Sequence, residues 1–167
     1  ILVDDGSTDG SLGVMRRYEG RPGVQVIAKP NGEQISAYNA GFERATGDVV
    51  LFLDSDDLLK SEALAHVAKA FGAGVAKVHF RLELMGPQGD PLGATIPNEL
   101  ARGEGAQDFL KRGVPHLSPP ASGNAYRRSV LQQIFPLPTD EQDRHGADFY
   151  VYTVHGTGYR LTDAEQS

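Results

Sequence analysis

The stretch Val49-Val50-Leu51-Phe52-Leu53-Asp54-Ser55-Asp56-Asp57 decides the fold of this chain. Five apolar residues run directly into a segment with three carboxylates in four positions. A short unbroken apolar run of this kind is typical of a strand that is buried on both faces. The carboxylates fall at the carboxyl end of that strand, where open α/β sheets bind their ligands. The stretch therefore predicts a central strand that ends in an acidic ligand site.

The segments before and after this strand alternate between strand and helix patterns. Ile35, Tyr38 and Phe42 recur every three to four residues, which predicts an amphipathic helix over residues 34–45. By similar reasoning we expect strands at residues 1–3 and 24–28, a helix that carries Leu12, Met15 and Tyr18, and a helix near residues 61–71. The order β-α-β-α-β-α predicts a mostly parallel sheet flanked by helices.

The pattern changes after Gly74. Apolar and polar residues alternate over residues 78–84, which predicts a half-exposed strand, and residues 86–91 form a turn cluster. Residues 97–120 are loop-rich, and we expect further helices at 129–135 and about 148–155. A regular half followed by a mixed, loop-rich half is consistent with a single domain over residues 1–167.

Composition excludes several classes of protein. The net charge of −6 disfavours a nucleic-acid partner, which would require a basic face. The chain has no Cys, so disulfides and thiolate metal sites are excluded. No apolar run approaches the roughly 20 residues of a membrane span, so a cytoplasmic location is the default expectation. Because the chain begins without Met, at Ile1 inside an expected strand, we expect it to be truncated at both ends.

Two acidic turns should lie at one edge of the expected sheet. Asp4 and Asp5 follow the first strand, and Asp54 and Asp56 follow the third. Two carboxylates about 4 Å apart repel by about 4 kcal/mol at an effective dielectric near 20, and a divalent cation would reverse that repulsion. With only oxygen ligands available, the sequence favours Mg²⁺ or Mn²⁺, completed by phosphate and water. The alternative is that these are solvated Asp residues of turns and helix caps.

The acidic segments also match parts of other motifs. Residues 5–10 imitate the start of a calcium-binding loop, but Arg16 stands where that loop requires Glu. No glycine-rich dinucleotide or P-loop motif is present. An aspartyl-phosphate phosphohydrolase with Asp54 as nucleophile stays open, although that class usually continues with a small hydroxyl residue where this chain has Leu58-Leu59. A non-catalytic module that binds a sugar nucleotide also stays open.

Three segments together resemble glycosyltransferase family 2. They are VDDGSTDGS at residues 3–11, NGEQISAYNAGFERATGDVVLFLDSDD at residues 31–57, and SGNAYRR at residues 122–128. The resemblance implies an inverting, hexosyltransferase-like enzyme with the GT-A fold, which is an α/β fold. It divides the chain into a nucleotide-sugar half, residues 1–74, and an acceptor half, residues 75–167. It also implies that an earlier strand of the family is missing before Ile1.

The resemblance implies roles for individual residues. Asp56 of the D-x-D motif would bind Mn²⁺ or Mg²⁺ at the diphosphate, and Asp54 would share the metal or bind the ribose. Asp4 or Asp5 would bind the base or ribose of the nucleotide, with a slight preference for Asp5. Asp148 would be the base that deprotonates the acceptor hydroxyl. The donor would be a nucleotide-diphospho-sugar, with a UDP-sugar preferred.

The resemblance also implies the acceptor and its setting. The acceptor would be a growing polysaccharide of the cell envelope or a glycolipid, so peripheral association with the inner face of the membrane is expected. Ala147 stands where the family more often has Glu, and Asp143 and Glu141 are the alternative bases. Tyr38 stands where the family often has Arg.

Because Tyr38 replaces the Arg that often contacts the donor in this family, another residue would have to supply that positive charge. The candidates are Lys29, Arg127 and Arg128. Asn39 and Gly41 lie on the helix whose start would face the nucleotide, although Asn39 is equally interpreted as a structural residue.

Overall fold

The computed structural model describes residues 1–100, 119–139 and, for the backbone only, 149–154. These residues form two compact units. The first comprises residues 1–78 and the described residues from 125 onward, and it contains both acidic turns. The second comprises the described residues between 79 and 124.

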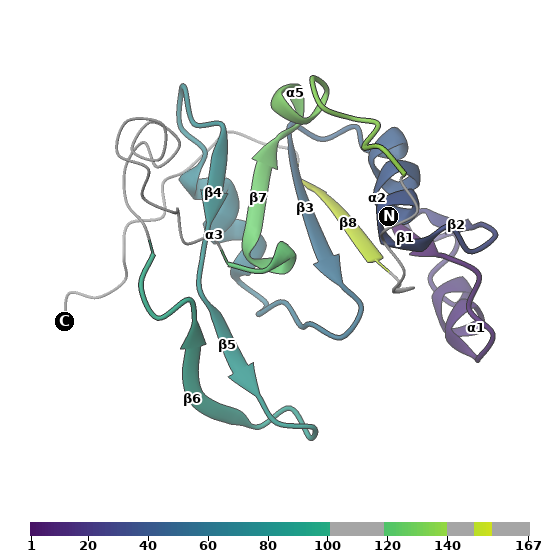
Figure 1. Cartoon of the computed structure of the whole chain (residues 1–167), viewed down its shortest axis with the longest axis horizontal. Coiled ribbons are helices and arrows are strands. Elements are labelled where there is room, and N and C mark those ends of the chain that lie inside the picture. Colours follow the sequence, from purple (N-terminus) through teal and green to yellow (C-terminus); the bar gives the residue numbers. More distant parts are fainter. Residues whose placement is uncertain (101–118, 140–148, 155–167) are drawn as a thin grey trace. The chain divides into compact units, whose positions relative to one another are not determined.

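A six-stranded sheet forms the centre of the first unit, with the strand order β2-β1-β8-β3-β7-β4 (Figure 1). Its strands are β1 (Leu2–Asp4), β2 (Val26–Ala28), β3 (Val49–Asp54), β4 (Lys77–His79), β7 (Asn124–Arg127) and β8 (Phe149–Val154). The helices are α1 (Ser11–Arg16), α2 (Glu33–Arg44), α3 (Ala63–Ala70) and the short α5 (Arg128–Leu131). The α/β class is confirmed, and each strand and helix expected over the first 71 residues is present, although α1 ends at Arg16 and does not include Tyr18.

Strand directions bring the two acidic turns to the same edge of the sheet. β1 pairs with β2 in parallel, and β8 runs antiparallel to both β1 and β3, so β1 and β3 point the same way. In these two ladders Phe149 lies opposite both Val3 and Asp54. The ends of β1 and β3 are therefore level with each other, two strand spacings or about 9.5 Å apart.

The expectation of a mostly parallel sheet is wrong, because most of the strand pairs in the described sheet are antiparallel. Helix-linked β1, β2 and β3 do run in the same direction, as the alternation of strands and helices predicts. However, β3 has antiparallel neighbours on both sides, β7 and β8, which come from the second half of the chain. These strands fill positions in the sheet that local sequence patterns do not specify.

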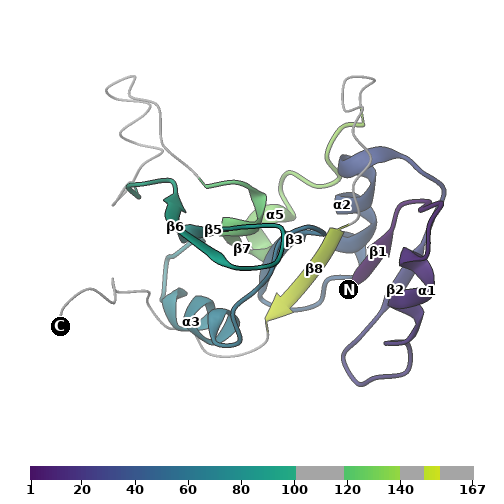
Figure 2. The same ribbon diagram turned by 90° about the horizontal axis from the view of Figure 1, so that it is seen from below.

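β3 is deeply buried, with residues 49–53 between 0% and 6% exposed. Successive side chains of a strand face opposite sides, and Val50 and Phe52 pack beneath α2 with Ala45 and Leu131. Figure 2 shows α2 on one side of the sheet and α3 on the other. A strand covered on both faces explains the continuous apolar run, and it gives Asp54 a rigid support.

The helix expected at about residues 148–155 is wrong, because residues 149–154 form β8. The segment reads Phe-Tyr-Val-Tyr-Thr-Val, and every residue in it is β-branched or aromatic. Such residues fit a pleated surface better than a helix, in which they lose side-chain freedom. The helix expected at residues 129–135 is shorter than predicted, since α5 ends at Leu131.

The second unit contains an antiparallel hairpin of β5 (Leu82–Met85) and β6 (Pro91–Ile96). The turn expected at residues 86–91 joins these strands and is confirmed, with the Gly86 N–H donating to the Asp90 carbonyl at 2.8 Å. The single strand expected over residues 78–84 is wrong, because β4 ends at His79 and β5 begins at Leu82. Among the described residues of both units, no helix is long and apolar enough to span a membrane.

Candidate active site

Asp54 is the last residue of β3 and is held from helix α2. The hydroxyl of Tyr38 donates to Asp54 Oδ1 at 3.4 Å, and Gln34 Nε2 donates to the Tyr38 hydroxyl at the same distance. Burial, followed by the negative charge of Asp54, raises the pKa of Tyr38 above its ordinary value. Tyr38 therefore remains a neutral phenol that supplies a hydrogen-bond donor to the carboxylate. A neutral donor stabilises Asp54 without cancelling its charge.

Asp56 and Asp57 lie on the turn that follows β3. The Asp57 N–H donates to the Asp54 carbonyl at 3.1 Å, which closes the turn. Asp56 is exposed, whereas Asp54 and Asp57 are partly buried. Throughout the described part of the chain, no group of three or more His, Cys, Asp or Glu side chains forms a complete metal site. Asp54 and Asp56 offer two carboxylates, a ligand set that suits Mg²⁺ or Mn²⁺ shared with phosphate oxygens.

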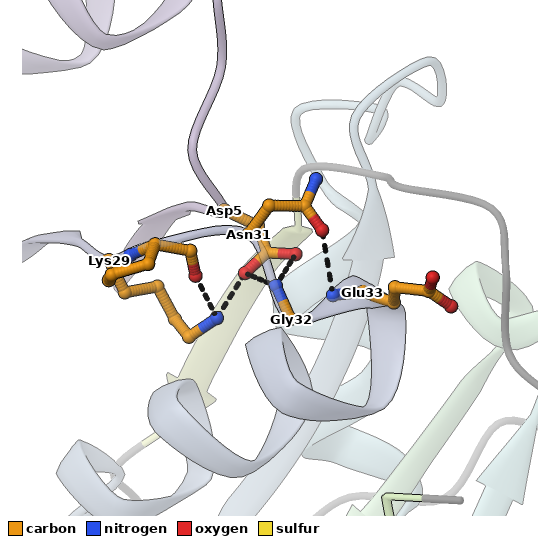
Figure 3. Close-up of polar contacts among 6 residues, drawn as sticks. Asp5, Lys29, Asn31, Gly32 and Glu33 are labelled. Carbon is orange, nitrogen blue, oxygen red and sulfur yellow. Dashed lines mark hydrogen bonds and ion pairs between the residues drawn. The ribbon is translucent and has the colours of Figure 1, made fainter. Parts of the chain in front are cut away.

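Asp5, just beyond the end of β1, is surrounded by positive charge and backbone donors. Figure 3 shows Lys29 Nζ and the Gly32 N–H converging on its carboxylate. The Gly32 N–H lies 3.2 Å from both carboxylate oxygens, and Lys29 also donates to the Pro30 carbonyl at 2.7 Å. Asp5 is 4% exposed, so its charge is compensated within the protein.

Two glycines make this close approach possible. Gly6 has φ +80°, and a Cβ there would lie 2.7 Å from the backbone nitrogen of Asn31. A Cβ on Gly32 would lie 2.6 Å from Ser36 Oγ and 3.0 Å from Lys29 Nζ. Gly6 is therefore required at the tight junction between β1 and α2, and Gly32 leaves room there for the side chains of Ser36 and Lys29.

Asp4 is the last residue of β1 and directly precedes Asp5. It is 2% exposed, and its Oδ1 atom has no hydrogen-bond partner among the described residues. The two buried carboxylates of the predicted pair thus differ in their partners: Asp5 is held by Lys29, and Asp4 Oδ1 has no hydrogen-bond partner among the described residues. The slight preference for Asp5 as the nucleotide-binding residue stays a prediction.

Of the three cations considered for the site, only Lys29 lies at the acidic edge. Arg127 pairs with Val49 at the start of β3, five residues or about 16 Å from Asp54. Its guanidinium donates to the carbonyls of Val75 and Gly72 at 3.1 Å and covers the ring of Phe71.

The neighbouring Arg128 lies at the same far end of β3, where its N–H donates to the Asp48 carbonyl at 2.8 Å. Arg127 and Arg128 are therefore structural residues at the opposite edge.

Asn39 is engaged by a distant part of the chain. Its Nδ2 donates to the Leu137 carbonyl at 2.9 Å, and the Leu137 N–H donates to its Oδ1 at 2.7 Å. The structural interpretation of this residue is therefore supported. Sequence reasoning missed Leu137, since the two residues are 98 positions apart and no local pattern links them.

Asp148 lies outside the described residues, as do Asp143 and Glu141. The next residue along the chain, Phe149, begins β8 opposite Asp54. The assignment of Asp148 as the base stays a prediction.

Comparisons with known proteins identify the family. The family model for glycosyl transferase family 2 matches residues 1–135. Over 146 residues the chain is 35% identical to an uncharacterized glycosyltransferase of Nostoc sp. (strain PCC 7120), covering 82% of this chain and 44% of that protein. It is 41% identical over 71 residues to the chondroitin synthase of Pasteurella multocida, covering 42% of this chain and 7% of the synthase.

A further relative is the undecaprenyl-phosphate 4-deoxy-4-formamido-L-arabinose transferase of Edwardsiella ictaluri. The identity is 39% over 77 residues, covering 44% of this chain and 24% of that enzyme. No solved structure matches the chain. The chain spans less than half the length of each of these relatives. The match to most of the chain, together with the acidic strand ends in an α/β fold, shows that this chain belongs to glycosyltransferase family 2 and has its GT-A fold.

Proposed function

We propose that this domain transfers a sugar, with inversion, from a nucleotide-diphosphate donor to a hydroxyl of a carbohydrate or glycolipid acceptor. One observation carries the proposal: Phe149 lies opposite both Val3 and Asp54, so the two acidic strand ends lie level at one edge. Ligands of open α/β sheets bind at this kind of edge. Family membership favours a transferase over a phosphohydrolase that uses Asp54 as its nucleophile.

The nucleotide would bind at the end of β1. Asp5 and Lys29 are buried or nearly so and are fixed before any ligand arrives, which suits the recognition of a base or ribose. Asp4 is the second candidate, because one of its buried oxygens lacks a hydrogen-bond partner among the described residues. We take the donor to be a UDP-sugar, and nucleoside diphosphates with other bases provide the comparison.

The diphosphate would lie at the end of β3. Asp54 and Asp56 would hold Mn²⁺ or Mg²⁺, and the fit is supported by their oxygen-only ligand set and by the exposure of Asp56. When bound, the metal would act as a Lewis acid that stabilises negative charge on the leaving diphosphate. Tyr38 keeps Asp54 in place by its hydrogen bond to Oδ1. Lys29, which follows β2, pairs with Asp5 at the same edge and supplies positive charge there.

Transfer with inversion is a direct displacement. The oxygen of the acceptor hydroxyl attacks the anomeric carbon, and the bond from that carbon to the diphosphate oxygen breaks. We assign the acceptor proton to the carboxylate of Asp148, which immediately precedes Phe149. A non-catalytic module would need no such base, so replacement of Asp148 separates the two possibilities.

The names of the relatives point to two classes of acceptor. One relative is named for transfer involving undecaprenyl phosphate, and another is named a chondroitin synthase. We therefore propose a lipid-linked or polysaccharide acceptor, with the domain working at the cytoplasmic face of the inner membrane.

Calorimetric titration with UDP, with and without Mn²⁺, tests the donor half of this proposal. Wild-type protein is expected to bind UDP in a Mn²⁺-dependent manner, and Asp56→Ala is expected to weaken that binding by at least about tenfold, as for the loss of one charged ligand. Asp57→Ala is the matched control, because it removes a neighbouring carboxylate that has no assigned role. UDP binding that needs no metal, or that Asp56→Ala leaves unchanged, would contradict the proposal.

A further inference from the structure

Three arginines lie close together on the segment between β1 and β2. Arg16 is the last residue of α1, and Arg17 and Arg21 follow it. All three are exposed, and none of them forms an ion pair within the described part of the chain. Glu19 is the only acidic residue in residues 10–28, although the whole chain has a net charge of −6. This segment therefore carries a net positive charge on an otherwise acidic protein.

Exposed apolar side chains lie beside these arginines. Met15 is 4% exposed and marks the side of α1 that packs on β1 and β2, whereas Val14 and Tyr18 are 49% and 41% exposed. Hydrogen-bonded turns continue past the end of α1: the Arg17 N–H donates to the Val14 carbonyl at 3.1 Å, and the Tyr18 N–H donates to the Met15 carbonyl at 3.0 Å. Residues three and four positions apart in such turns are neighbours. Val14, Arg17 and Tyr18 therefore lie together on the outer side of α1.

Arg21 is held beside Tyr18. Its guanidinium carbon lies 4.6 Å from the centre of the Tyr18 ring, and its N–H donates to the Tyr18 carbonyl at 3.2 Å. Gly20 and Gly23 have φ values of +80° and +79°, and they turn the chain on either side of Arg21. The guanidinium and the ring are thus brought together before any partner binds, and both residues stay exposed.

We propose that Val14, Arg16, Arg17, Tyr18 and Arg21 form a docking surface for the anionic phospholipids of a membrane. Arginine is attracted to an anionic lipid surface and pairs with phosphate groups through two parallel hydrogen bonds. Exposed apolar and aromatic side chains next to basic residues suit the boundary between headgroups and acyl chains. A nucleic acid or a soluble polysaccharide would also attract the arginines, but it offers no apolar phase in which Val14 could be buried. The inference deepens the proposed function and rests on it for the membrane location of the acceptor.

The topology separates this docking surface from the acidic turns. Figures 1 and 2 show α1 beside β2, the last strand at one end of the sheet. Because β1 and β2 are parallel, the chain between them must return from the carboxyl end of β1 to the amino end of β2. Residues 17–23 lie on the last part of this return, whereas the acidic turns follow the carboxyl ends of β1 and β3. An anionic membrane would attract the first edge and repel the second, so a donor could reach the acidic edge from solution.

Vesicle sedimentation tests the docking surface. The vesicles contain phosphatidylglycerol and phosphatidylcholine in equal parts, and vesicles of phosphatidylcholine alone are the comparison. We expect wild-type protein to bind the anionic vesicles at least about tenfold more tightly, and added salt to weaken that binding. Arg17→Glu should lower the affinity at least about tenfold, because it replaces an attracted charge by a repelled one. Val14→Ser should lower it about threefold or more through the loss of apolar area.

Lys60→Glu is the matched control. It makes the same change of charge in the exposed segment that follows the acidic turn of β3, and should leave vesicle affinity within about twofold of wild type. Equal losses for Arg17→Glu and Lys60→Glu would overturn the inference, as would wild-type protein that does not bind the anionic vesicles. Binding to soluble polygalacturonate that depends on Arg17, without binding to vesicles, would assign the surface to an anionic glycan and also overturn it.

UDP titration of the same preparations keeps this test separate from the proposed function. Arg17→Glu should bind UDP in Mn²⁺ as wild type does, because Arg17 is remote from the carboxylates at the ends of β1 and β3. Wild-type protein that binds vesicles but no UDP would overturn the proposed function and leave the docking surface in place. Wild-type protein that binds UDP but no anionic vesicles would do the reverse.

Discussion

The ends of β1 and β3 carry aspartates at the same edge of the sheet. These aspartates differ in their burial and in the groups that contact them. At the end of β1, Asp5 is buried and its charge is met by Lys29 and the Gly32 N–H. At the end of β3, Asp54 is partly buried against a neutral phenol, and Asp56 is exposed. A buried charge destabilises the protein unless it is paired, whereas an exposed charge is solvated and can bind a ligand from solution. The difference supports the proposal that the end of β1 recognises the nucleotide and that a bound metal completes the end of β3.

The largest expected effect is on the rate of sugar transfer, which we propose depends on Asp148 as the base. Asp148→Asn should lower kcat for transfer by about 10²–10⁴, the range for loss of a general base. Mn²⁺-dependent UDP binding should be unchanged, because we assign that binding to the carboxylates at the ends of β1 and β3. Initial-rate kinetics and calorimetry on the same preparation measure both quantities. Equal rates for the variant and the wild type would instead favour a different base or a binding module.

The second prediction concerns the ion pair between Lys29 and Asp5 at the end of β1. Lys29→Ala leaves the carboxylate of Asp5 buried without its cation, and should lower the free energy of unfolding by about 2–3 kcal/mol. This is below the 3–5 kcal/mol for fully buried pairs, because the side chain of Lys29 is 20% exposed. Urea unfolding measures the change. Arg17→Ala is a control of equal charge at an exposed position and should change stability by less than about 0.5 kcal/mol.

Urea unfolding also tests the end of β3, where we expect no structural role for the exposed carboxylate. Asp56→Ala should leave stability within about 0.5 kcal/mol of wild type, since the residue is exposed. A destabilisation of Asp56→Ala as large as that of Lys29→Ala would show that both ends are structural.

A third prediction concerns the junction that holds Asp5 in place. Gly6→Ala should lower the free energy of unfolding by about 1–3 kcal/mol, because the added Cβ would lie 2.7 Å from the Asn31 nitrogen at a φ of +80°. Gly13→Ala is the matched control: nothing lies within 4 Å of its Cβ, and it lies within α1. That control should stabilise the protein by up to about 1 kcal/mol. Thermal unfolding distinguishes the two, and equal effects of the same sign would contradict the tight junction.

The smallest effect is expected at the phenol that supports Asp54. Tyr38→Phe removes a hydrogen bond of 3.4 Å and should cost about 0.5–1 kcal/mol near neutral pH. The pKa of Tyr38 is higher in the folded protein than its ordinary value of 10.0. Its contribution is therefore fully present below pH 10 and is lost as the pH rises through the folded pKa. Urea unfolding between pH 8 and 11 should show the advantage of the wild type shrinking above pH 10, and a constant advantage would be the contrary result.

Local patterns were sufficient to predict most of the elements in the first 71 residues. The apolar run of residues 49–53 predicted β3, and the three-to-four spacing around Tyr38 predicted α2, because burial on one or both faces leaves a direct mark on sequence. The acidic turns were placed at one edge from strand direction alone. What these patterns could not show was which carboxylate is compensated, since Lys29 lies 24 residues from Asp5.

The second half depends on contacts between distant residues. Residues 149–154 were expected to be helical, although their β-branched and aromatic side chains favour a strand. Their place between β1 and β3 could not be predicted, because nothing in a short segment specifies its neighbours in a sheet. Asn39 was placed on the correct helix, but its role depends on Leu137, which no spacing rule connects to it.

The position of β8 has a consequence for how the protein is made. Of the described strands, β8 is synthesised last, yet it lies between β1 and β3, which are synthesised first. Until it arrives, the nascent chain presents two strands with unpaired backbone edges, which are prone to pair with other chains. Pairing β8 with β1 and β3 brings together residues that are far apart in the sequence, and such pairing is also slow. We therefore expect the edge at which we propose donor binding to be completed only in the last step of folding, so that a ribosome-bound fragment ending before residue 149 would neither bind UDP nor remain monomeric.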